Sequence, residues 1–214
     1  MRQLYLFVLI IIICPCCSES KTDWKAVYDS LNDDFAEYGR TYSTETYDRI
    51  ISKCDLLIES SPEFRNAALM SKSSILAYSN QYDEAVKVAE QIPDTALIYS
   101  SFRSKTVYIN SLLSYKANRS GDMDCARMYN DKVLSELEGW ISVRKDSLYH
   151  ALMYQPREVP VIRNQHIAAF MFYLVNLSYY DEQKVKIAIE DLKSNIPECT
   201  ENAIDYFNYF DDCF

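Results

Sequence analysis

The fold is decided by residues 61–93, which read SPEFRNAALMSKSSILAYSNQYDEAVKVAEQIP. Ser61-Pro62-Glu63 combines an N-cap residue, a proline at the first helical position and an acid in the first turn, which predicts a helix that runs to about Ser79. Asn80-Gln81 interrupts the helical pattern. The next apolar residues share one face of a shorter helix that ends before Pro93: Ala85, Val88, Ala89 and Ile92. The stretch therefore predicts two antiparallel helices joined by a tight turn.

The same alternation of helices and turns extends in both directions. Upstream, apolar residues at helical spacing predict helices over residues 23–38 and 44–60. Downstream, Asp94 is placed to cap a long helix that runs to about Asn118. Ser120-Gly121-Asp122 then turns the chain into a return helix that ends near Gly139. We expect one continuous helical domain over residues 23–214.

Composition supports the same fold class. Among 214 residues there are 3 glycines and 6 prolines, too few for the many turns of a β-sandwich. The segment Gln155–Pro160 is the clearest interruption, because its two prolines disfavour a continuous helix. It is expected to be a loop before a C-terminal helical pair that begins near Val161. The fold class is therefore expected to be all-α.

Two of the expected turns carry a family resemblance. Asn80-Gln81-Tyr82-Asp83-Glu84-Ala85 resembles the turn Gly-Asp-Tyr-Asp-Glu-Ala of tetratricopeptide repeats, and Gly121-Asp122-Met123-Asp124-Cys125-Ala126 aligns with it. A third, weaker copy begins at Tyr180-Asp181-Glu182. The resemblance implies stacked antiparallel helical hairpins in a superhelix, with a surface that binds a protein or peptide partner. The alternative is an irregular helical bundle whose turns read alike.

The N-terminus has the layout of an export signal. A single positive charge at Arg2 precedes the apolar run Leu4–Ile13, and the cysteine-rich Cys14-Pro15-Cys16-Cys17 follows. The run has about ten residues, whereas a helix needs about 20 to cross the hydrocarbon core of a bilayer. We expect residues 1–16 to be a removed signal peptide, with a transmembrane anchor as the alternative.

The cysteine cluster resembles the lipobox of bacterial lipoprotein signals. With Cys17 as the lipid-modified residue, Cys16 occupies the position for a small residue, although Cys14 stands where leucine is usual. Cys16 is the alternative, and it would place Pro15 beside the cleaved bond. The resemblance implies a membrane lipid anchor at Cys17 and a tether over residues 17–22. It also implies a location in the bacterial cell envelope, with the outer membrane as the expected membrane. A secreted soluble protein is the alternative.

Composition and motifs also limit the chemistry. A net charge of −9 and the lack of a Lys/Arg-rich run disfavour nucleic-acid binding. The two histidines, His150 and His166, have no carboxylate or cysteine at a ligand spacing, and no glycine-rich phosphate loop occurs. We therefore expect no catalytic, metal or cofactor residues. Together with the signal, the repeat resemblance implies a non-enzymatic binding scaffold. An enzyme with an unrecognised site is the rival class.

Cysteines and tyrosines supply the remaining candidates. Cys54 falls in an apolar helical stripe and is expected to be a small buried side chain. Cys199 and Cys213 flank one short C-terminal helix and form the candidate disulfide pair. The 18 tyrosines crowd the C-terminal third, where they fit either helix packing or a groove for a peptide or glycan: Tyr149, Tyr154, Tyr173, Tyr179, Tyr180, Tyr206 and Tyr209.

Overall fold

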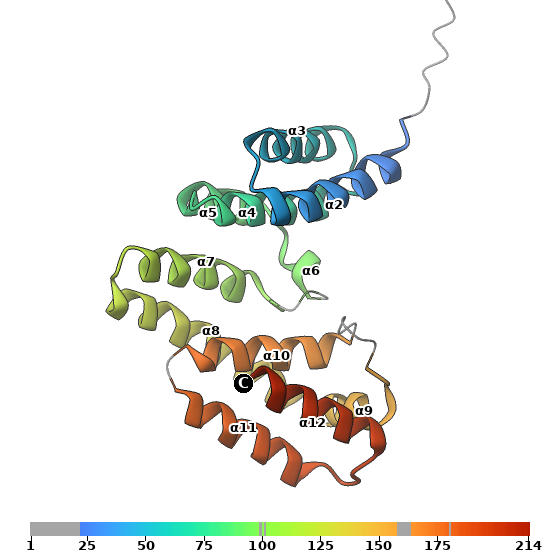
Figure 1. Cartoon of the computed structure of the whole chain (residues 1–214), viewed down its shortest axis with the longest axis vertical. Coiled ribbons are helices and arrows are strands. Elements are labelled where there is room, and N and C mark those ends of the chain that lie inside the picture. Colours follow the sequence, from blue (N-terminus) through green and yellow to red (C-terminus); the bar gives the residue numbers. More distant parts are fainter. Residues whose placement is uncertain (1–21, 99, 101, 158–163, 180) are drawn as a thin grey trace, which may run out of the picture.

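The computed structural model describes residues 22–98, 100, 102–157, 164–179 and 181–214. These residues form helices joined by short connections, with no strand among them (Figure 1). The helices are α2 (Trp24–Thr41), α3 (Thr44–Ser60), α4 (Arg65–Tyr78), α5 (Tyr82–Ala89), α6 (Asp94–Leu97), α7 (Lys105–Arg119), α8 (Met123–Val143), α9 (Lys145–Tyr154), α10 (Gln165–Ser178), α11 (Glu182–Asn195) and α12 (Glu201–Cys213). The all-α prediction is confirmed.

Apart from the four-residue α6, each helix packs on the next one along the chain. The contacts run from α2 to α3, α4 and α5, continue through α7, α8 and α10, and reach α11. Figure 1 shows the resulting order, with α3 at the top, α2 level with α4 and α5 beneath it, then α7 and α8, and α10 and α11 towards the bottom. Helices α9 and α12 pack against each other, and α9 also packs on α10. Sequential packing of helical hairpins is therefore the organising feature of the chain.

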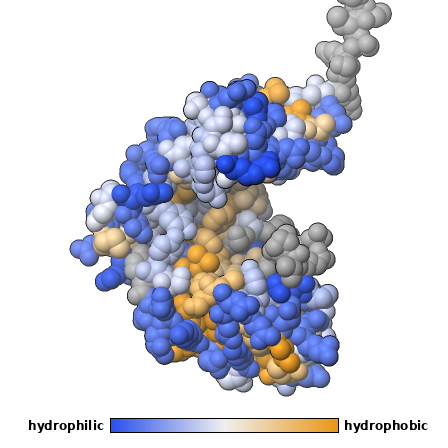
Figure 2. All heavy atoms as spheres, in the orientation of Figure 1, coloured by the Kyte–Doolittle hydropathy of each residue, from blue (hydrophilic) through white to orange (hydrophobic). Residues whose placement is uncertain are grey.

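The core is divided into clusters that follow the same order. One cluster joins α2, α3 and α4 around Leu31 and Ile50, and the next joins α4, α5 and α7 around Ile92. The largest lies in the C-terminal part and includes Phe170 and Phe210. Cys54 is fully buried in the first cluster, as its place in an apolar stripe predicts. On the face in Figure 2, hydrophilic residues cover most of the upper part, and hydrophobic residues gather in the hollow below it.

Two hairpin turns, 41 positions apart in the sequence, have the same backbone geometry. Asn80 and Gly121 both adopt the left-handed conformation, with φ of 61° and 81°. In each turn the next residue donates its backbone N–H to a carbonyl of the preceding helix: Gln81 to Leu76 at 2.8 Å, and Asp122 to Ala117 at 2.9 Å. Bonds of this type satisfy carbonyls that a helix end would otherwise leave without a partner.

The two hairpins also share a buried side-chain hydrogen bond. Ser73 Oγ donates to the carbonyl of Ala85 at 2.9 Å, and Ser114 Oγ donates to the carbonyl of Ala126 at 3.0 Å. All four residues are buried, and the alanines leave room for the paired helices to approach closely. The two turns, whose sequences align, therefore also make equivalent hydrogen bonds in the structure.

The prediction of one long helix that starts at Asp94 is wrong. The chain forms the four-residue α6, breaks, and starts α7 only at Lys105. Two local features cause the break: Arg103 has a φ of 64°, which a helix does not allow, and the Ser104 side chain accepts a hydrogen bond from the backbone N–H of Val107 at 3.2 Å. Ser104, rather than Asp94, is the N-cap of the outgoing helix.

Three other boundaries differ from the prediction. Helix α4 begins at Arg65, one turn after Pro62, because residues 62–64 form a turn. Helix α8 continues past Gly139 to Val143. Helix α10 begins at Gln165, since the Asn164 side chain accepts hydrogen bonds from two backbone N–H groups of its first turn. The second half of the loop expected over residues 155–160 lies outside the described residues, which stop at Arg157.

Two glycine-to-alanine substitutions should have opposite effects. G121A places a Cβ on a residue with φ of 81°, so we expect the free energy of unfolding to fall by about 1 kcal/mol. G139A lies inside α8 with nothing within 4 Å of the new Cβ, so the free energy of unfolding should rise by about 0.5–1 kcal/mol. Urea unfolding followed by circular dichroism measures both, and equal signs would contradict the turn geometry.

Candidate binding groove

A groove of about 530 Å³ lies where the first helices of three successive hairpins meet. Helices α4, α7 and α10 supply most of its lining, with contributions from the first residue of α5 and from the segment before α7. Its lining residues are Ser74, Ala77, Tyr78, Tyr82, Phe102, Tyr108, Ser111, Leu112, Tyr115, Asn118, Arg119, Phe172 and Tyr179. Seven of them are aromatic, so the groove is an aromatic surface with hydroxyl groups on it.

Three aromatic rings form the inner end of the groove. Phe102 lies 4.4 Å from Tyr108 and 5.0 Å from Phe172, measured between ring centroids, and the second pair is edge-to-face. Tyr108 is buried, and its hydroxyl lies 3.5 Å from Ser74 Oγ and from the carbonyl of Met70. Burial raises the pKa of Tyr108, while its contacts with serine hydroxyls lower it. The hydroxyl is protonated at neutral pH and can donate a hydrogen bond.

Tyrosines form the outer end. The rings of Tyr115 and Tyr179 meet edge-to-face at 5.9 Å, and burial raises the pKa of Tyr115. Tyr78 is 73% exposed and Tyr179 is 48% exposed. An exposed cation, Arg119, lies on the same wall. Aromatic rings at partial exposure can cover an apolar side chain of a ligand, while hydroxyl and guanidinium groups can bind its polar groups.

A second hollow, of about 400 Å³, lies between α8, α10 and α11. Its walls carry charges of both signs, including Glu138, Lys145, Lys184 and Asp191, around the rings of Phe170 and Tyr173. Opposite charges at one site neutralise one another, so this surface favours neither an anionic nor a cationic ligand. We therefore regard the aromatic groove as the stronger candidate.

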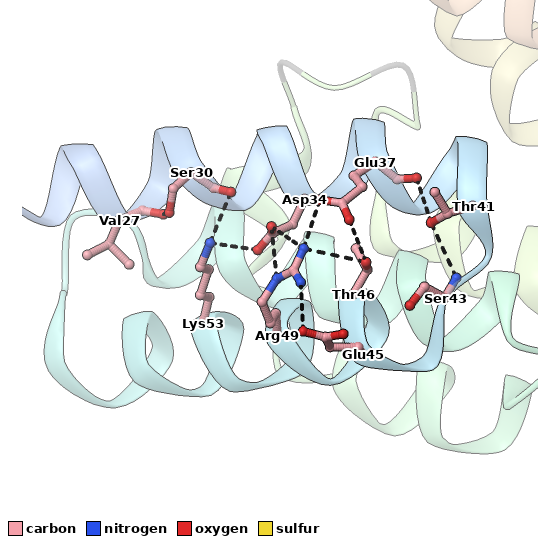
Figure 3. Close-up of polar contacts among 10 residues, drawn as sticks. All are labelled: Val27, Ser30, Asp34, Glu37, Thr41, Ser43, Glu45, Thr46, Arg49 and Lys53. Atoms are coloured by element: carbon pink, nitrogen blue, oxygen red, sulfur yellow. Dashed lines mark hydrogen bonds and ion pairs between the residues drawn. The ribbon is translucent and has the colours of Figure 1, made fainter.

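A polar network joins α2 to α3 (Figure 3). Asp34, 7% exposed, accepts hydrogen bonds from Lys53 Nζ at 2.6 Å and from Arg49 Nη2 at 3.2 Å. Arg49 Nη2 also donates to Glu37 at 2.8 Å, and Glu37 accepts a bond from Thr46 Oγ1 at 3.1 Å. Every charged group in this network has a partner of opposite charge, which indicates a structural role.

The described residues include no group of three histidine, cysteine, aspartate or glutamate side chains that could hold a metal ion. His150 is exposed on α9 and its ring contacts Tyr154, whereas His166 is half-buried in the first turn of α10. Neither lies in the groove. Among these residues no helix has the length and apolar character required to cross a bilayer.

The two cysteines of the predicted disulfide do not line the groove. Cys17 and its alternative Cys16 are outside the described residues. Cys199 and Cys213 are free thiols, and Cys213 is the last residue of the 13-residue helix α12 while Cys199 precedes its start. At a rise of about 1.5 Å per residue, the helix separates them by about 20 Å, whereas bridged Cα atoms lie within about 7 Å. A bridge between them would require α12 to unwind.

The clustered tyrosines of the C-terminal third divide between core and surface. Tyr149 and Tyr206 are buried in the C-terminal cluster, and Tyr179 is the member that lines the aromatic groove. Tyr180 lies outside the described residues. The groove tyrosines Tyr78, Tyr82, Tyr108 and Tyr115 were not among the predicted candidates. For Tyr108 and Tyr115 the sequence carries a signal of a shared surface, because their spacing with Arg119 places all three on one face of a single helix.

Comparisons with protein-family models, curated proteins and solved structures return no match for this chain. The groove is therefore interpreted from its own geometry.

Removing Asp34 should destabilise the N-terminal hairpin. D34A leaves Lys53 and Arg49 without their buried acceptor, so we expect the free energy of unfolding to fall by about 1–3 kcal/mol. D29A, on the same helix, removes an exposed pair with Lys25 and should change it by less than about 0.5 kcal/mol. Urea unfolding of both variants measures the difference. Equal losses would show that the network does not clamp α2 to α3.

Proposed function

We propose that this protein is a non-catalytic scaffold that binds an extended peptide segment of a protein partner in the aromatic groove, and that it is held at the bacterial cell envelope by a lipid on Cys17. The observation that carries the first part is the convergence of seven aromatic side chains from three successive hairpins on one groove. A groove of about 530 Å³ falls in the usual range of ligand sites, about 300–1,000 Å³.

The chemistry of the lining supports a peptide ligand. Edge-to-face ring pairs such as Phe102 with Phe172 leave ring faces that an apolar side chain can contact. Ser74 and Asn118 provide hydroxyl and amide groups that can bind peptide N–H and C=O groups. Aromatic and arginine side chains are the residue types that dominate the energy of protein–protein recognition.

The helical arrangement supports the same function. The tetratricopeptide resemblance of the turns at Asn80 and Gly121, together with their equivalent hydrogen bonds, favours a superhelix of repeated hairpins. In such a superhelix the equivalent helices of successive hairpins line a common surface. Helices α4, α7 and α10, which line the groove, hold this position in their hairpins.

Selection from a random peptide library displayed on phage tests the groove. We expect peptides selected on the wild-type protein to bind Y78A/Y179A about tenfold or more weakly, because both removed rings line the groove. The control is Y154A, which removes a tyrosine of matched exposure outside the groove, 54% against 48% for Tyr179, and should leave affinity unchanged. Peptides that bind both variants equally, or no enrichment in repeated selections, would contradict the proposal.

Metabolic labelling with an alkyne fatty acid tests the anchor. When the full chain is expressed in a bacterium, we expect the label to be attached to the wild-type protein and lost in C17S, because the thiol is the acylated group. C16S should keep the label. Loss in C16S but not in C17S would assign the anchor to Cys16, and an unlabelled wild-type protein would favour a secreted soluble form.

A further inference from the structure

A cationic cluster surrounds Trp140 of α8, formed by Arg103 just before α7, Arg144 just after α8 and His166 in the first turn of α10. The guanidinium carbon of Arg103 lies 5.0 Å from the centre of the Trp140 ring, and that of Arg144 lies 4.7 Å from it. The His166 ring stacks on the same indole at 5.4 Å. One indole therefore holds two guanidinium groups and an imidazole together.

Arg103 is 5% exposed, an unusual burial for an arginine. Its Nη1 donates to the carbonyl of Ile98 at 2.6 Å and to Gln165 Oε1 at 3.1 Å. Its Nε and Nη2 have no hydrogen-bond acceptor among the residues that the structure describes. Buried guanidinium donors are costly to leave unpaired, so this edge of Arg103 calls for an acceptor.

The unpaired edge has the shape that binds a carboxylate. Nε and Nη2 point to the same side of a guanidinium, and their two parallel N–H groups match the two oxygens of a carboxylate. Arg157 provides the comparison within this chain: its Nε donates to Asp205 Oδ2 at 2.9 Å, and its Nη2 donates to Asp205 Oδ1 at 3.3 Å. Arg103 presents the same pair of donors, and no described residue pairs with them.

The electrostatic surroundings of Arg103 are positive. Burial, followed by the neighbouring charge of Arg144, lowers the pKa of Arg103 to about 10. Burial and the charges of Arg103 and Arg144 also lower the pKa of His166, whose buried Nδ1 has no hydrogen-bond partner among the described residues. The chain as a whole carries a net charge of −9, whereas no carboxylate of the described residues contributes to the pKa shifts of Arg103 and His166.

We propose that the Nε/Nη2 edge of Arg103, backed by Trp140, Arg144 and His166, is a binding site for a small carboxylate ligand. Arg103 supplies the two-pronged contact, and Arg144 supplies a second positive charge. Exposure increases from Arg103 through the half-buried Trp140 to the exposed Arg144, so the anion approaches from the Arg144 side. The site does not depend on the aromatic groove or on the lipid anchor.

Tryptophan fluorescence tests the site directly, because the chain has 2 tryptophans and W24F leaves Trp140 as the reporter. Titration with sodium acetate, at constant ionic strength kept by sodium chloride, should change the Trp140 emission in a saturable way. R103K keeps the charge but loses the two-pronged edge, so acetate should bind about tenfold or more weakly. R157K is the matched control, because its guanidinium is already paired with Asp205, and should bind as the parent does.

Two further variants keep the test decisive. R144Q changes an exposed side chain, so it should fold even if R103K does not, and it must weaken acetate binding. E158Q removes a carboxylate of the chain that lies outside the described residues, and it should leave acetate binding unchanged. The proposal is overturned by an unsaturable acetate response, by an equal response to chloride, by unchanged binding in R144Q, or by binding that appears only in E158Q.

Discussion

The burial of each helix's apolar stripe against the next helix in the chain is the constraint on which the rest of the structure depends. A single amphipathic helix cannot cover its own stripe, and most helical stability in proteins comes from such packing. Two short turns make the arrangement possible because they reverse the chain within a few residues, at Asn80 and Gly121. Small buried residues such as Ala85 and Ala126 then allow the paired helices to approach.

This arrangement also explains where the aromatic groove lies. When hairpins stack in order, their first helices face a common side, and side chains that are distant in sequence come together there. Tyr78 of α4, Tyr115 of α7 and Tyr179, which directly follows α10, meet in this way. The groove thus belongs to the stacking of hairpins rather than to any one of them. In contrast, the Asp34 network lies within a single hairpin and pins its two helices together.

Sequence periodicity was sufficient for the early helix pair and for the turns at Asn80 and Gly121, since these depend on neighbouring residues. The early pair, the turn at Asn80 and the turn at Gly121 all lie where their residue types place them. The break before α7 was missed because an aspartate followed by apolar residues reads as a helix start, whereas Ser104 provides the cap that the chain uses. A left-handed arginine at position 103 has no signature in sequence.

The candidate groove could be predicted only in part. Periodicity places Tyr108 and Tyr115 on one helix face, but it does not tell whether that face meets another hairpin or solvent. The count of tyrosines drew attention to the C-terminal third, where Tyr149 and Tyr206 are buried in the core. Long-range contacts decide between these roles, as the edge-to-face pair of Phe102 and Phe172 illustrates. Such pairs link residues that no local pattern connects.

The division of the core into clusters has a consequence for how the chain loses its structure. Ile51 and Ile58 pack against both of the first two clusters, Phe102 packs against the second and the small cluster of Val107, Val133 and Leu137, and Tyr173 joins that one to the C-terminal cluster. Cooperativity between adjacent parts of a helical array is carried by such shared side chains. Unfolding that starts at either terminus would therefore pass from one cluster to the next through Ile58, Phe102 and Tyr173, because each of these side chains packs against two clusters.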